Sequence, residues 1–114
     1  MTVQTRMTGD VVILEVAGDI AFGKGSDVVL KEAVNGVLEQ GRRHLVLDVG
    51  QVGYVDSAGL GQLVQLHTAA GRRDGTLKLL HVTPRLRTLL SATRLLSVFE
   101  TFDDEAAAAA SFGA

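Results

Sequence analysis

A serine hydroxyl beside a carboxylate is the most informative chemical feature of this sequence. The run Asp56-Ser57-Ala58-Gly59-Leu60-Gly61 joins a loop to an apolar pattern that is typical of a helix. The first turn of a helix has unpaired backbone N–H groups and a partial positive charge, so a serine can cap it and a phosphate would be stabilised there. We expect Ser57 to be the N-cap, with Asp56 just before it.

Two glycines, Gly59 and Gly61, fall in the same helical turn. Glycine costs about 1 kcal/mol relative to alanine in a helix interior and less near an end, so local helix stability does not explain both. Without side chains, this end of the helix would be bare, and the backbone of another protein could approach it closely. The pattern therefore predicts a protein-binding surface around one hydroxyl.

Other chemistries have weaker support. The run Gly23-Lys24-Gly25-Ser26 lacks the length and the final Gly-Lys-Ser/Thr order of a phosphate-binding loop, so we interpret it as a flexible loop. His44, His67 and His81 fall on three separate elements, without the paired spacing of a metal site. Ser57 lies outside a Gly-x-Ser-x-Gly motif and no base can be assigned to it, which argues against a hydrolase.

Composition limits the remaining possibilities. The 114 residues are 46% apolar and 4% aromatic, with no tryptophan, which predicts one aliphatic core and one domain over residues 1–114. Thirteen acids against eleven bases give a net charge of −2 without a basic stripe, which argues against nucleic-acid binding. The chain has no cysteine, no apolar run of about 18 residues and no signal-peptide pattern in residues 1–10. We therefore expect a cytoplasmic protein without membrane contact.

The element order predicts the fold class. Strand patterns cover residues 2–7, 11–17, 44–49, 77–82 and, more weakly, 98–102; helical patterns begin at Ser26 or Asp27, near Ser57, at Pro84 and near Glu105. We expect Ser26 or Asp27 to cap the first helix, and close packing to offset the cost of Gly36 in its middle. The order predicts an α/β domain: a mixed sheet of four or five strands with an N-terminal antiparallel hairpin, and about four helices mainly on one face.

These residues resemble a known family. The run Val52-Gly53-Tyr54-Val55-Asp56-Ser57-Ala58-Gly59-Leu60-Gly61 is similar to the signature of STAS domains, in particular of bacterial anti-sigma factor antagonists. Asp48 matches the aspartate that ends the family's preceding strand, and Gly18-Asp19-Ile20 resembles its turn after the second strand. Three positions depart from the pattern: Ala58 replaces a second serine, Ala21 replaces an acid and Gly50 replaces a common serine.

The resemblance implies a binding switch and not an enzyme. Members bind an anti-sigma factor that is also a serine kinase, and so free the sigma factor. The kinase phosphorylates the serine that corresponds to Ser57, which blocks binding, and a phosphatase reverses the step. The kinase brings ATP and Mg²⁺, so no cofactor is expected. Phosphate would add about −1.5 to −2 charges beside Asp56.

The resemblance also implies where the partner binds. We expect the surface to comprise the loop over residues 18–25 and the start of the helix. Its predicted contact residues are Asp19, Ile20, Phe22, Asp56, Ser57, Ala58, Gly59, Leu60 and Gly61. The protein is expected to be a monomer or a weak dimer. Two alternatives remain open: a non-phosphorylated STAS subunit of a signalling or lipid-transport assembly, and a STAS module that senses a small ligand.

Overall fold

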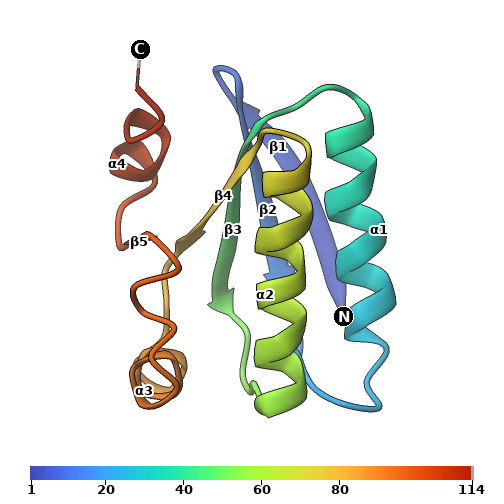
Figure 1. Ribbon diagram of the computed structural model, residues 1–114, viewed down its shortest axis with the longest axis vertical. Helices are drawn as coiled ribbons and strands as arrows, with labels where there is room; N and C mark the ends of the chain where they lie inside the picture. Colours follow the sequence, from blue (N-terminus) through green and yellow to red (C-terminus); the bar gives the residue numbers. More distant parts are fainter. Residues whose placement is uncertain (114) are drawn as a thin grey trace.

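A mixed β-sheet forms the centre of the computed structural model, which describes residues 1–113 (Figure 1). The strands are β1 (Thr2–Thr8), β2 (Val11–Ala17), β3 (His44–Gln51), β4 (Thr76–Leu80) and β5 (Thr101–Phe102), and the helices are α1 (Ser26–Glu39), α2 (Ser57–Arg72), α3 (Pro84–Ala92) and α4 (Glu105–Ala110). The spatial order is β1-β2-β3-β4-β5. The β1–β2 hairpin is antiparallel, and the later neighbours are parallel. This confirms the predicted fold class.

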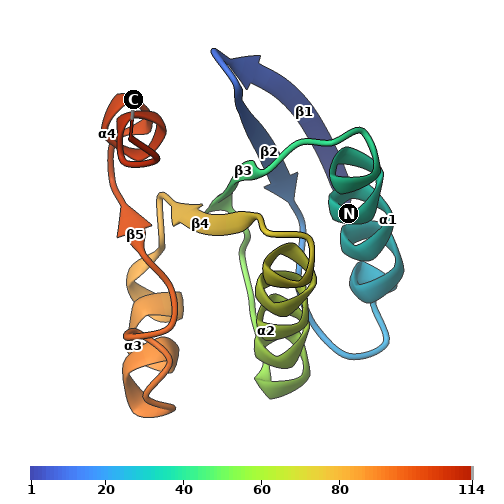
Figure 2. The same cartoon turned by 45° about the horizontal axis from the view of Figure 1, so that its top comes forward.

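Helices α1 and α2 lie side by side on one face of the sheet, which we call the front face (Figures 1 and 2). Apolar residues at helical spacing make the contact, because Leu30 of α1 and Leu63 of α2 are fully buried against Leu14, Leu47 and Leu79 of the sheet. Helix α3 adds its buried leucines to the same cluster. The core is aliphatic, as the composition indicates.

The opposite face, which we call the back face, is covered in part by α4 (Figure 2). Ala108 of α4 is fully buried in a second apolar cluster with Val11, Ile13, Val46 and Leu80. The alanine-rich tail is therefore docked in this structure. Three helices share the front face and the fourth covers the back, which is consistent with the prediction that helices lie mainly on one face.

Some helix starts follow the sequence signals. Thr83 caps α3 by accepting a hydrogen bond from the Leu86 N–H, with Pro84 as the first helical residue. Asp104 caps α4 in the same way. The last strand is shorter than predicted, because it pairs with β4 only over Thr101–Phe102.

Two expectations about α1 are wrong. Gly25 stands at its N-cap with φ 74°, and no side chain caps the helix. Ser26 instead is fully buried, where its hydroxyl bonds to Ala21 and Gln62. Close packing does not explain Gly36 either, because a β-carbon there would meet no atom of residues 1–113 within 4 Å.

Candidate partner-binding site at the start of α2

Asp56, and not Ser57, caps α2. Its backbone is extended (φ −100°), and its Oδ1 accepts a hydrogen bond of 2.7 Å from the Gly59 N–H. Its carbonyl accepts the first helical hydrogen bond, from the Leu60 N–H at 2.9 Å. Ser57 is therefore the first helical residue, and the expectation that it serves as the cap is wrong. The carboxylate is the stronger acceptor, and it satisfies a first-turn N–H that would otherwise lack a partner.

The same carboxylate also ties α2 to the loop after β2. Its Oδ2 accepts a hydrogen bond of 3.1 Å from the Phe22 N–H. Ile20 strengthens this connection, because its N–H donates to the Tyr54 carbonyl at 3.0 Å and it forms a parallel bridge with Val55. The hydrogen bonds from Gly59 and then Phe22 hold the pKa of Asp56 below its usual value. Asp56 is therefore ionised at neutral pH.

An exposed rim surrounds this connection, and we call it the Ser57 surface: Phe22, Ser57, Ala58 and Gly61. All four residues are exposed, and Phe22 has an exposed fraction of 83%. The Ser57 hydroxyl makes no hydrogen bond with any group of residues 1–113, and the residue is exposed. The first turn of α2 thus presents a hydroxyl next to a fixed carboxylate and an aromatic ring on a tethered loop.

The other predicted contact residues lie deeper. Ile20, Gly59 and Leu60 are buried, and Asp19 is half-buried. In this conformation the three buried residues can shape the Ser57 surface from beneath but cannot touch a partner. The structure thus separates the predicted contact residues into buried ones that support the Ser57 surface and exposed ones that form it.

The two glycines of the first turn have different roles. A β-carbon at Gly59 would lie 1.8 Å from the Ile20 carbonyl oxygen and 2.6 Å from its carbon. Gly59 is therefore required by contact within the chain, and the interpretation that it leaves room for another protein is wrong. At Gly61 a β-carbon would meet no atom of residues 1–113 within 4 Å. Only Gly61 leaves the helix surface open.

Two supporting side chains had no sequence signal. Gln62 accepts a hydrogen bond of 2.7 Å from the buried Ser26 hydroxyl, which in turn accepts one from the Ala21 N–H. This links α1, α2 and the loop that carries Phe22. Arg85 of α3 lies over the Tyr54 ring, with its guanidinium carbon 5.7 Å from the ring centroid. Such contacts join segments that are distant in sequence, which is why no local pattern indicates them.

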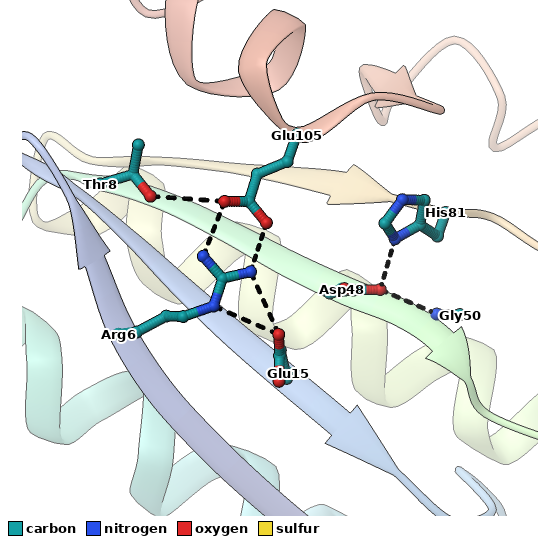
Figure 3. Close-up of polar contacts among 7 residues, drawn as sticks. All are labelled: Arg6, Thr8, Glu15, Asp48, Gly50, His81 and Glu105. Atoms are coloured by element: carbon teal, nitrogen blue, oxygen red, sulfur yellow. Dashed lines mark hydrogen bonds and ion pairs between the residues drawn. The ribbon is translucent and has the colours of Figure 1, made fainter.

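Asp48 belongs to a different region, on the back face (Figure 3). Its Oδ1 accepts the Gly50 N–H at 3.0 Å and lies 3.0 Å from His81 Nδ1. A β-carbon at Gly50 would lie 3.0 Å from the β-carbon of His81, which gives a reason for the glycine at this position. Asp48, Gly50 and His81 line a cleft of about 550 Å³ together with Glu15. Asp48 thus fastens the ends of β3 and β4 and does not join the Ser57 surface.

An ion-pair cluster beside this cleft fastens α4 (Figure 3). The Arg6 guanidinium bonds to Glu105 at the start of α4 and to Glu15 of β2. Arg6 holds the pKa of Glu105 below its usual value, and the two carboxylates raise that of Arg6. These groups are partly exposed, so each pair adds little to stability, about 0.2–1 kcal/mol.

Residues 1–113 contain no group of three or more histidine, aspartate or glutamate side chains arranged to hold a metal ion. No helix in the same residues is long and apolar enough to cross a membrane.

The chain belongs to the STAS domain family, which it matches over residues 2–108. BtrV of Bordetella bronchiseptica, provisionally named an anti-sigma factor antagonist, is 32% identical over 75 residues. That alignment covers 66% of this chain and 65% of BtrV, so it spans less than two thirds of that relative.

Solved structures share the fold. A crystal structure of a provisionally named anti-sigma factor antagonist from Thermotoga maritima has a TM-score of 0.85 at 21% identity, covering 96% of this chain and 92% of that one. Bacillus SpoIIAA in its phosphorylated form has a TM-score of 0.73 at 17% identity, covering 98% of this chain and 100% of that one. At these identities the likeness is one of fold.

Proposed function

We propose that this protein is an anti-sigma factor antagonist that binds an anti-sigma factor through the Ser57 surface and is switched off by phosphorylation of Ser57. The observation that carries the proposal is the free, exposed hydroxyl of Ser57 on the first turn of α2, beside the ionised cap Asp56. The name of BtrV supports the same class of partner. The protein acts by binding, and its partner kinase supplies ATP.

Phe22 is the anchor of the proposed interface. The residue is 83% exposed, while its backbone N–H donates a hydrogen bond to Asp56. An aromatic side chain on a tethered loop loses little conformational entropy on binding, and burying it contributes about 1.5–3 kcal/mol. Phe22→Ala should therefore weaken partner binding by about tenfold or more. The fold should be unaffected, because the ring has few contacts within the chain.

The charge of phosphate explains the switch. In the free protein the N–H groups of the first turn of α2 tolerate a phosphate on Ser57. In a complex, the added charge of about −1.5 to −2 would lie beside the Asp56 carboxylate and would have to be desolvated at the interface. A loss of about 1.4 kcal/mol already weakens binding tenfold. Bacillus SpoIIAA, which shares the fold, has been solved in a phosphorylated form.

The test combines mass spectrometry with binding. The wild-type chain, Ser57→Ala and Ser91→Ala are incubated with a cognate anti-sigma kinase and with ATP. Ser91 is an exposed serine on α3, so it controls for general access to hydroxyls. The wild type and Ser91→Ala should gain about 80 Da, the mass of one phosphoryl group, and then lose the partner. Ser57→Ala should keep its mass and its partner.

Other outcomes would contradict the proposal. Phosphate on Ser57→Ala would place the modified residue elsewhere. Binding without any phosphorylation would favour the non-phosphorylated STAS subunit. Absence of both binding and phosphorylation would remove the anti-sigma factor as the partner.

A further inference from the structure

Three segments at one edge of the sheet each present an exposed side chain. Strands β2, β3 and β4 are parallel neighbours, so the segments that follow them leave the same edge of the sheet in the same order. Phe22 follows β2 and Ser57 follows β3, and both belong to the Ser57 surface. Arg85 follows β4 in the first turn of α3, at the same end of the molecule (Figure 1). The Ser57 surface therefore has an exposed neighbour on α3.

Tyr54 connects Arg85 to the Ser57 surface. Of the four phenylalanines and one tyrosine, only Phe22 and Tyr54 are exposed, and Tyr54 has an exposed fraction of 44%. The Tyr54 carbonyl accepts the Ile20 N–H at 3.0 Å, which fixes its backbone two residues before the cap Asp56. Its ring lies 5.7 Å from the guanidinium carbon of Arg85. Aromatic residues and arginine are the residue types that most often dominate protein interfaces.

The position of Arg85 is unfavourable for α3 itself. Arg85 is the second residue of the helix, and the positive end of a helix dipole disfavours a cation in the first turn. The first turn of α3 contains no acidic residue, and Arg85 forms no ion pair within residues 1–113. Local helix stability therefore does not account for a cation at this position.

We propose that Tyr54 and Arg85 extend the binding surface for the anti-sigma factor, and that the partner places a carboxylate on Arg85. This inference rests on the proposed function, because it assigns a further contact to the same complex. An arginine over an aromatic ring keeps its planar set of N–H donors, which match the two oxygens of a carboxylate. Tyr54 thus positions Arg85 and adds its own exposed ring to the surface.

The spacing of these contacts fits one interface. Neighbouring strands lie about 4.8 Å apart, so the ends of β2 and β4 are separated by about 10 Å. An interface of standard size, with roughly 800 Å² per partner, extends well beyond this distance. Ser57 follows β3 and so lies between Phe22 and Arg85 along the edge. A partner that reaches both of these residues must therefore cover Ser57, which is where the proposed phosphate would be added.

Binding of the cognate anti-sigma kinase to variants of the whole chain tests the extension. Arg85→Glu should weaken binding by about tenfold or more, because it removes a charged hydrogen bond and introduces repulsion. The same change should leave Tm unchanged or slightly higher, since an acid suits the first turn of α3. Arg73→Glu is the matched control: it makes the same charge change at the C-cap of α2, about 24 Å along that helix from Ser57, and should bind like the wild type.

Substitutions at Tyr54 separate its two roles. Tyr54→Phe keeps the ring and should bind like the wild type, whereas Tyr54→Ala should weaken binding by about tenfold. The double variant Y54A/R85E should lose less affinity than the product of the two single fold-changes, because Tyr54 acts partly by positioning Arg85. Higher ionic strength should shrink the loss caused by Arg85→Glu and leave the loss caused by Phe22→Ala unchanged.

The outcomes distinguish this inference from the proposed function. A wild-type chain that binds the anti-sigma kinase, and that phosphorylation of Ser57 releases, supports the function. If Arg85→Glu and Tyr54→Ala then bind like the wild type, the extension is wrong while the function stands. A loss of affinity in Arg85→Glu that salt does not reduce would exclude the partner carboxylate. A wild-type chain that binds no anti-sigma kinase would overturn both.

Discussion

Replacing Gly59 by alanine tests how the candidate site is built. The new β-carbon would lie 1.8 Å from the carbonyl oxygen of Ile20, where ordinary contact begins near 3.4 Å. The start of α2 and the loop after β2 must therefore separate by about 1.6 Å. The loop cannot yield freely, because the Ile20 N–H donates to Tyr54 and the Ile20 side chain is fully buried.

The expected cost is the balance of three effects. Overpacking of this kind costs about 1–3 kcal/mol. Losing the Ile20–Tyr54 hydrogen bond adds about 1 kcal/mol, whereas alanine in a helix regains less than 1 kcal/mol near an end. The net loss is about 1–4 kcal/mol. In a domain of this size it lowers Tm by roughly 4–16 °C.

Gly61→Ala is the matched control, two residues further along the same helix. Its β-carbon would meet no atom of residues 1–113 within 4 Å, so its Tm should stay the same or rise slightly. Thermal unfolding followed by circular dichroism compares the three proteins at one pH. If Gly59→Ala and Gly61→Ala have the same Tm, the contact with Ile20 does not constrain the chain, and Gly59 is not required by it.

The remaining predictions concern other parts of the chain. Asp56→Asn keeps one acceptor for the cap but loses the bond to Phe22. Because the pKa of Asp56 is lowered on folding, its stabilising effect is complete above the ordinary value of 3.8 and is lost as the pH falls below it. The Tm difference from wild type should therefore be largest near pH 7 and shrink below about pH 4; a constant difference would contradict this. His67→Leu should stabilise the fold by about 1 kcal/mol in denaturant unfolding, since Nδ1 is buried without a hydrogen-bond partner in residues 1–113. Ala108→Asp should release α4 and lower Tm, whereas the exposed Ala107→Asp should not, and equal Tm values would show that α4 adds no stability.

Local signals were sufficient for much of the fold. The β1–β2 hairpin, the apolar faces of α1 and α2, and the Thr83-Pro84 start of α3 all follow from spacing and turn chemistry within a few residues. These features depend on short-range backbone preferences and on apolar periodicity, which the sequence contains directly. The same holds for the position of the candidate site, because the motif around Ser57 lies where a loop meets a helix.

Only the tertiary structure decided how the candidate site is built. The sequence indicates that Asp56 and Ser57 begin a helix, but it does not show that Asp56 holds both the helix and the loop while Ser57 stays exposed. This arrangement depends on the Phe22 N–H, which the loop after β2 brings to the second carboxylate oxygen of Asp56. The reason for Gly59 is likewise the carbonyl of Ile20, a residue of another element. Contacts between distant segments arise from the packing of the whole chain. The sequence by itself therefore determined the elements and the place of Ser57 near a helix start, and the fold determined which residues surround it.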